Sequence, residues 1–189
     1  MTTVQIKHRY TDAVLFECEV PEQHRGMSMR YALEQANKND ADLYAANLRG
    51  ANLYAANLRG AELRDADLRD ANLRAANLRG AELRGANLYG AELRDAELRD
   101  TNLYGAKIDG ETVSINPISM TGLRWSILIT DGFMRIGCQR HAHDAWESFG
   151  DAEIGEMDSN APEFWSQWRE PLLAMCKAHA SKVAPITQS

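Results

Sequence analysis

The sequence has few cysteines, no long hydrophobic run and no excess of positive charge, and each absence excludes a class of protein. The three cysteines of the 189-residue chain, Cys18, Cys138 and Cys176, lie far apart. An odd, scattered set predicts reduced thiols in a cytoplasm rather than a disulfide framework. No stretch approaches the roughly 18 apolar residues of a membrane span, and a signal-peptide pattern is lacking, so we expect neither membrane insertion nor secretion. The net charge of −6 disfavours direct nucleic-acid binding.

A five-residue repeat fills the chain from Ala41 to Gly110. Fourteen units follow without an insertion; the first position is alanine except at Thr101, and the third is leucine except at Ile108. An α-helix would scatter leucines five apart around its surface, and a flat strand would send alternate leucines to opposite faces. These leucines share one interior only if each unit turns the chain through about a right angle, with glycines at the tight corners. Four units then close one coil.

These units resemble the pentapeptide repeat family, whose unit is A(D/N)LXX. The resemblance implies a mainly β fold in which residues 41–110 form a right-handed quadrilateral β-helix, a pentapeptide repeat solenoid. Some members of that family mimic DNA with an acidic rod and protect DNA gyrase. Here residues 41–110 include ten basic and eleven acidic residues, so the rod is nearly neutral. Gyrase mimicry is therefore disfavoured.

Residues 1–40 are expected to form an N-terminal cap, a hairpin plus a helix, that covers the first coil, because an open solenoid end exposes apolar core and unpaired strand edges. The segments 3–9 and 13–19 are typical of two strands. Ser28 is a suitable N-cap for a helix over 29–38.

Residues 111–189 are expected to form a small C-terminal α+β domain, because the repeat pattern stops at Gly110. Asp131-Gly132 is a strong hairpin turn. Asn160 is placed to begin a longer helix, which Pro171 should kink or split. The expected strands and helices are 112–116, 123–130, 133–138, 144–149 and 160–182.

The flanking parts also resemble a group of phage and prophage pentapeptide repeat proteins. That resemblance is carried by the hairpin KHRYTDAVLFECEV, the helix before the repeats, and the motifs RIGCQRH and CKAHA. It implies a location in the cytoplasm of a bacterial host and a host protein as partner, but no reaction.

Stacked coils predict ladders of side chains on the outside of the solenoid. Arginine and tyrosine are favoured anchors at interfaces, so the ladders are candidate binding residues. In the competing interpretation, the arginines pair with neighbouring acids and keep the surface soluble. The face of Arg59, Arg79 and Arg99 is expected to be the most basic. The candidates are Arg59, Arg79, Arg99, Arg74, Arg94, Arg64, Arg84, Tyr44, Tyr54 and Tyr104.

The C-terminal part contains two Cys-x-x-His pairs, Cys138/His141 and Cys176/His179. They have spacing compatible with a zinc site. A second interpretation is favoured, because Cys176 and His179 fall on a predicted apolar helix stripe where a buried thiol and a packed imidazole need no metal. No cofactor is therefore expected. The stripe consists of Phe164, Trp165, Trp168, Leu172, Cys176 and His179.

Acidic residues dominate the segment 144–163, which holds no lysine or arginine. It is interpreted either as a solvated loop or as an acidic docking patch for a basic protein surface. The patch would consist of Asp144, Glu147, Asp151, Glu153, Glu156 and Asp158.

These observations favour a non-catalytic protein-interaction module over an enzyme, because no catalytic motif or phosphate-binding glycine loop is present. The phage-like resemblance implies a modulator of a host defence or DNA-processing factor. One alternative is a sponge that sequesters a small anionic nucleotide. Another is a metal-dependent hydrolase around Cys138 and His141. Trp165 and Trp168 exceed what one small core is expected to bury, which favours a homo-oligomer through the C-terminal domain.

Overall fold

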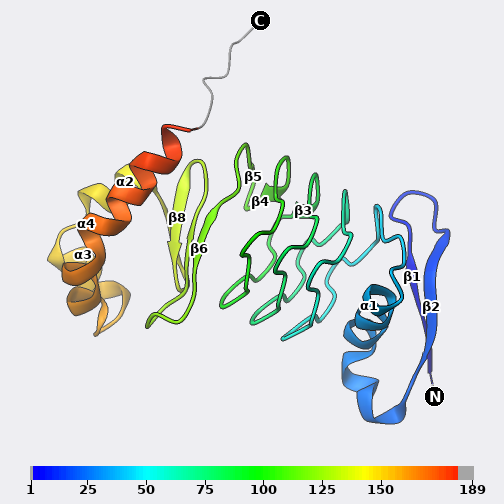
Figure 1. Cartoon of the computed structure of the whole chain (residues 1–189). Coiled ribbons are helices and arrows are strands. Elements are labelled where there is room, and N and C mark those ends of the chain that lie inside the picture. Colours follow the sequence, from blue (N-terminus) through cyan, green and yellow to red (C-terminus); the bar gives the residue numbers. More distant parts are fainter. Residues whose placement is uncertain (1, 183–189) are drawn as a thin grey trace, which may run out of the picture. The chain divides into compact units, whose positions relative to one another are not determined.

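The computed structural model describes residues 2–182, which belong to two compact units, Met1–Asn116 and Pro117–Ser189 (Figure 1). The repeats lie in the first unit. The finer division into residues 1–40, 41–110 and 111–189 stays a prediction. None of the helices that the structure describes is both long enough and apolar enough to cross a bilayer.

The repeats wind with a register of 20 residues. Parallel bridges join Asn57 to Asn77 and Asn77 to Glu97, and the other parallel bridges of the repeats have the same spacing. The third-position side chains from Leu43 to Ile108 are at most 8% exposed, so they form one interior. The repeats are therefore a β-helix solenoid whose coils are visible in Figure 1. Its pairing consists of short strands and isolated bridges, without a closed sheet, and the right-handed quadrilateral detail stays a prediction.

Every coil corner is made by the fifth residue of a unit. All fourteen of these residues, from Ala45 to Gly110, have positive φ. The sequence predicts glycines at corners, but alanine and aspartate fill half of these positions. Left-handed backbone costs a residue with a side chain roughly 1–2 kcal/mol. The repeats tolerate this cost at Ala45, Ala55 and Ala75, where φ lies between 52° and 55°.

Replacing Gly85 with alanine is expected to destabilise the first unit more than replacing Gly80. Both have nearly the same φ, +70° and +69°. A Cβ on Gly85 would lie 2.2 Å from Oδ1 of Asp65, one coil below, whereas a Cβ on Gly80 meets nothing within 4 Å. Gly80→Ala should therefore cost about 1 kcal/mol from backbone strain alone, and Gly85→Ala should cost more. Urea midpoints measure the difference, and equal midpoints would contradict the contact with Asp65.

Residues 2–38 form a hairpin and a helix, as predicted. Strand β1 (Thr2–Lys7) pairs antiparallel with β2 (Val14–Val20), and η1 (Glu22–Met27) leads into α1 (Ser28–Lys38). The predicted N-cap is wrong. Ser28 is the first helical residue, and its hydroxyl donates to the Arg25 carbonyl oxygen, because the preceding 3-10 turn runs directly into the helix.

Hydrogen bonds join both ends of the solenoid to the segments that flank it. At the first coil, the Asn47 N–H donates to the Lys7 carbonyl at 2.7 Å, and the Asn57 N–H donates to the side-chain Oε1 of Glu34 in α1 at 2.8 Å. At the other end, the short strands β3 (Asn87–Leu88), β4 (Lys107–Ile108) and β5 (Glu111–Thr112) form one sheet in that order. The predicted strand 112–116 is thus wrong, because the chain leaves the sheet after Thr112.

The second unit is an antiparallel sheet with three helices. Its strands are β6 (Ile118–Met120), β7 (Ile127–Ile129), β8 (Phe133–Ile136) and β9 (Gln139–Ala142), paired in sequence order. The hairpin at Asp131-Gly132 is confirmed, since Ile129 pairs with Met134. The helices are α2 (His143–Ser148), α3 (Asp151–Met157) and α4 (Ala161–Ala180). The strands β6 and β9 and the helix α3 were not predicted.

Helix α4 differs from its prediction in two details. It runs through Pro171 without a break, so the split is wrong, whereas the kink given as its alternative stays a prediction. Asn160 precedes the helix but makes no capping hydrogen bond; its amide contacts Asp158 and Ser159 instead.

The apolar stripe of α4 packs into the core of the second unit. Phe164, Trp165, Leu172, Cys176 and His179 are buried, and Trp168 packs against this core, so the predicted stripe is confirmed. Trp165 is only 4% exposed. The surplus of exposed tryptophan from which self-association was inferred is therefore not found among the described residues.

Candidate functional site

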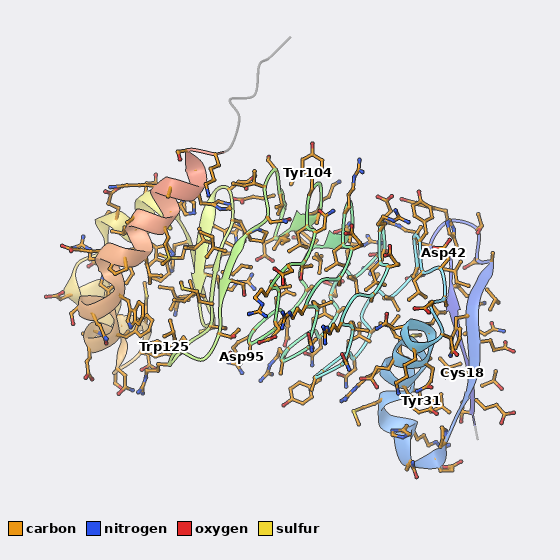
Figure 2. The ribbon with its side chains drawn as sticks, in the orientation of Figure 1. Cys18, Tyr31, Asp42, Asp95, Tyr104 and Trp125 are labelled. Atoms are coloured by element: carbon orange, nitrogen blue, oxygen red, sulfur yellow. The ribbon has the colours of Figure 1, made fainter. Side chains whose placement is uncertain are left out.

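The predicted ladder of Tyr44, Arg64, Arg84 and Tyr104 lies on one face of the first unit. These side chains line a groove of about 400 Å³, together with the corners at Asp65, Gly85 and Gly105. Both tyrosines are exposed, Tyr44 by 48% and Tyr104 by 56%. Figure 2 labels Tyr104 at the outer surface of the coils. The stacking predicted for these four residues is therefore present.

A local hydrogen bond sets the direction of the ladder side chains. In units whose second residue is aspartate or asparagine, that residue accepts a hydrogen bond from the backbone N–H of the fourth: Asp42 accepts from Tyr44 at 3.0 Å, and Asn72 from Arg74 at 3.1 Å. Such Asx turns are typical of aspartate and asparagine. In these units the bond closes the turn before the corner, so the fourth side chain is presented outward.

Most ladder arginines form ion pairs, as the second interpretation of the ladders expects. The pairs are exposed apart from the Asp67 side, so each contributes about 0–1 kcal/mol. Arg79 and Arg99 share Asp100, which reduces the free charge expected on their face. The pairs are Arg49–Asp70, Arg64–Glu62, Arg69–Asp67, Arg74–Glu92, Arg79–Asp100, Arg94–Asp95 and Arg99–Asp100.

The pair of Arg69 and Asp67 differs from the others because its carboxylate is buried, with Asp67 only 4% exposed. Nε and Nη2 of Arg69 donate to the two carboxylate oxygens. These hydrogen bonds lower the pKa of Asp67. The guanidinium of Arg69 is therefore already bound to Asp67, and this pair stabilises its face of the solenoid.

Arg59 and Arg84 are the two ladder arginines without an ion pair among residues 2–182. Arg84 lies against an aromatic ring instead: its guanidinium carbon is 6.0 Å from the ring centroid of Tyr104. Arg64 forms only a long ion pair, with its Nε 3.8 Å from Oε2 of Glu62. The groove therefore combines one unpaired guanidinium and one weakly paired guanidinium between two exposed phenol rings.

The hairpin turn adds aromatic and basic side chains beside Tyr44. The His8 ring lies 5.8 Å from Tyr10 and 6.3 Å from Tyr44. Arg9 donates to the Asp65 carbonyl at 2.8 Å and lies 4.7 Å from the Tyr10 ring. Sequence reasoning missed these residues, because nothing in the repeats fixes how the hairpin docks.

We call Tyr10, Tyr44, Arg64, Arg84 and Tyr104 the Tyr/Arg face. The remaining candidates, Tyr54, Arg74, Arg94, Arg59, Arg79 and Arg99, do not line its groove.

The acidic segment of the second unit is mostly helical rather than a loop, while its acidic side chains are solvated, as that interpretation expects. The six acidic residues of the predicted patch are all exposed and come from α2, α3 and the α3–α4 connection. Glu147 pairs with Lys177 at 2.7 Å. Asp158 accepts the Asn160 N–H, which lowers the pKa of this carboxyl group. The residues are Asp144, Glu147, Asp151, Glu153, Glu156 and Asp158.

The four cysteine and histidine candidates do not assemble a metal centre. Cys138 is exposed, whereas Cys176 is buried beside the Met134 sulfur, and burial raises the pKa of its thiol to about 11. The His141 ring packs edge-on against Trp146, and His179 faces Asp131. Within the described chain no three His, Cys, Asp or Glu residues are placed to hold a metal ion. The arrangement of these residues therefore gives no support to the zinc site or to the metal-dependent hydrolase, which the sequence already disfavours.

A comparison with models of protein families finds the same repeats that the sequence and the fold show. The model for pentapeptide repeats, in eight copies, matches residues 36–74 and 71–110. The repeat region of this chain, residues 36–110, is therefore similar to the pentapeptide repeat family. Residues before 36 and after 110 lie outside this match. Among curated proteins there is no match.

Three solved structures are similar to parts of the chain. HetL, a pentapeptide repeat protein involved in heterocyst differentiation regulation from the cyanobacterium Nostoc, is 42% identical over 38% of this chain and 38% of its own, with a TM-score of 0.22. A pentapeptide repeat protein from the Arabidopsis thaliana thylakoid lumen is 33% identical over 32% of this chain and 46% of its own, with a TM-score of 0.20. The Nostoc protein alr5209 is 28% identical over 43% of this chain and 83% of its own, with a TM-score of 0.23. The match thus spans less than half of the first two proteins.

Proposed function

We propose that this chain is a non-catalytic protein-interaction module that binds its partner through the Tyr/Arg face. The proposal takes the solenoid to be right-handed and quadrilateral, as the family resemblance implies. Coils of that shape hold the fourth-position side chains at fixed spacing, so the face is presented without reorganisation. Prior ordering of this kind lowers the entropic cost of binding.

The observation that carries the proposal is the groove formed by Tyr44, Arg64, Arg84 and Tyr104. Arginine offers planar donors to carboxylate or phosphate groups, and tyrosine adds rigid amphipathic area. Arg84 is supported by an aromatic ring rather than neutralised by an acid. The proposed partner therefore presents carboxylate or phosphate groups at its surface.

The phage-like motifs at both ends support a finer form of the proposal. In that form the chain is a phage-type modulator of a bacterial host defence or DNA-processing factor, and it acts in the cytoplasm of the host. This step rests on the resemblance of KHRYTDAVLFECEV, RIGCQRH and CKAHA alone.

The proposal is tested by comparing two double variants as baits in a bacterial lysate, followed by calorimetry on the purified pair. Arg64→Ala/Arg84→Ala removes the guanidinium groups of the groove. Arg79→Ala/Arg99→Ala removes the same charge from arginines that already share Asp100. We expect the first variant to lose about 30-fold or more in affinity, because arginine hot spots contribute at least about 2 kcal/mol, and the second to bind nearly as wild type. Equal losses, or no stoichiometric partner for the wild type, would count against the proposal.

A second candidate function is the nucleotide sponge, which the size of the groove favours. About 400 Å³ lies within the range of ligand sites, roughly 300–1,000 Å³. Phosphates would contact Arg64 and Arg84, and a base would stack on a tyrosine. Calorimetric titration with nucleotides separates the two functions, since a sponge binds tightly in the absence of any protein partner.

A further inference from the structure

The second unit contains a partly open pocket with aromatic walls. It has a volume of about 70 Å³ and lies between the sheet and the helices α3 and α4. Four of its lining residues are aromatic, and Asp158 adds a carboxylate. Figure 2 labels Trp125, one of these walls. The pocket is lined by Trp125, Trp146, Phe164, Trp165, Asp158 and Ala161, among others.

The aromatic walls are held in place by the core. Trp125 and Phe164 meet edge to face at 5.1 Å, and the rings of Trp146 and Trp165 lie 5.3 Å apart. Nε1 of Trp146 donates to the Met134 carbonyl at 2.7 Å. Because Trp146, Phe164 and Trp165 are all at most 8% exposed, the pocket exists before any ligand arrives.

The charge around the pocket favours a cation. Residues 117–189 hold nine acidic and six basic residues, and the exposed acids of α3 stand next to the pocket wall that this helix provides. Hydrogen bonds from Asn160 keep the pKa of Asp158 low, so its carboxylate is charged at neutral pH. The guanidinium carbon of Arg124 lies 5.2 Å from the Trp125 ring centroid, and its charge also helps to lower the pKa of Asp158. A bound ammonium group would therefore share this ring and this carboxylate with a cation of the chain itself.

The size of the pocket restricts the ligand. A single water needs about 10–15 Å³ of such volume, and an engineered cavity of about 150 Å³ binds benzene. A volume of about 70 Å³ therefore suits a compact group of a few heavy atoms. An alkylated ammonium ion is more easily removed from water than a compact one, so an aromatic pocket binds it with a larger net gain.

We propose that this pocket binds a small alkylated ammonium group, such as the trimethylammonium head of choline or of a methylated lysine. The walls of Trp125, Phe164 and Trp165 surround the methyl groups, and Asp158 provides the counter-charge. This site is independent of the Tyr/Arg face and of the function proposed for it.

Choline and 3,3-dimethylbutan-1-ol form a matched pair of probes, because they share one shape and differ in the charge of the central atom. We expect choline to quench or shift tryptophan fluorescence of the full chain saturably. Its affinity should exceed that of the alcohol by at least about fivefold, within the range of cation–π interactions. Calorimetry on the same samples gives both dissociation constants.

Three variants locate the site. Asp158→Asn, at an exposed position, should weaken choline binding several-fold and leave the alcohol unchanged. Asp144→Asn removes the same charge from a residue outside the pocket and should change neither. Ala161→Phe fills the pocket from the first turn of α4 and should abolish binding of both probes, with circular dichroism confirming that the chain is folded.

Two results would overturn the proposal. Equal affinity for both probes would mean that the pocket binds apolar groups without regard to charge. If choline does not bind saturably below about 10 mM, an alkylated ammonium group is not the ligand of this pocket. Choline binding that survives in Arg64→Ala/Arg84→Ala would separate this site from the Tyr/Arg face, so either proposal can fail without the other.

Discussion

Replacing Leu68 with alanine is expected to lower the free energy of unfolding of the first unit by about 2–5 kcal/mol. Leu68 is fully buried in the middle of the solenoid. The bridges from Asn47 to Asp67 and from Asp67 to Asn87 place Leu48 and Leu88 in the coils directly before and after it. Removing its side chain leaves a cavity between two coils that the backbone ladder holds at fixed spacing, so collapse cannot fill it. Urea unfolding followed by circular dichroism measures the loss.

Leu98→Ala is the matched control, because Leu98 occupies the same position of a unit in the last coil. It is 8% exposed, and no coil follows it. We expect a distinctly smaller loss, since part of the truncated side chain already contacts solvent and fewer atoms surround the gap. Losses of the same size at both positions would contradict the view that stacking between coils supplies the extra stabilisation.

The solenoid was predictable because its information is local and repeated. Alanine at the first position of a unit (except Thr101) and leucine at the third (except Ile108) share one interior only when the chain turns at each unit, and the structure has this arrangement. The corners were less predictable. Ala75 has positive φ, although alanine rarely adopts it, whereas aspartate, as at Asp65, is one of the few residues besides glycine that do so more often. Here the register between coils overrides the local backbone preference.

The ladder of Tyr44, Arg64, Arg84 and Tyr104 was predicted, and so was pairing of the arginines with neighbouring acids, but the particular acid that each arginine contacts was not. Arg49 pairs with Asp70, and Arg79 with Asp100. In both cases the acid is the fifth residue of a unit one coil further on. That signal was present in the sequence, since the predicted coil already gives the register. The predicted ladders compare only residues at the same position of their units. They therefore miss these pairs, which join the fourth residue of one unit to the fifth residue of another.

The second unit shows where sequence reasoning failed. The stripe of α4 and the hairpin at Asp131-Gly132 were predicted, because each has a distinct periodic or turn signal. Strand β9 was missed, because its sequence QRHA offers only partly buried or exposed positions. The zinc alternative, already disfavoured in the sequence, gains no support for a related reason: spacing places Cys138 near His141 along the chain, but burial separates Cys138 at the surface from Cys176 in the core.

Trp146→Phe is expected to destabilise the second unit by about 2–4 kcal/mol. Trp146 is 2% exposed, and its Nε1 donates to the Met134 carbonyl at 2.7 Å. Phenylalanine removes this donor and leaves a buried acceptor with one partner fewer, in addition to the lost ring volume. Thermal or chemical unfolding followed by near-ultraviolet circular dichroism measures the change, because tryptophan packing dominates that signal.

Trp165→Phe separates the two contributions. Trp165 is almost equally buried, at 4% exposed, but its Nε1 has no hydrogen-bond partner among the described residues. The same substitution therefore removes a similar volume without breaking a hydrogen bond, and it also relieves an unsatisfied donor. We expect a loss smaller than that of Trp146→Phe by about 1–2 kcal/mol. If both variants lose the same free energy, then packing alone stabilises this core and the hydrogen bond to Met134 contributes nothing measurable.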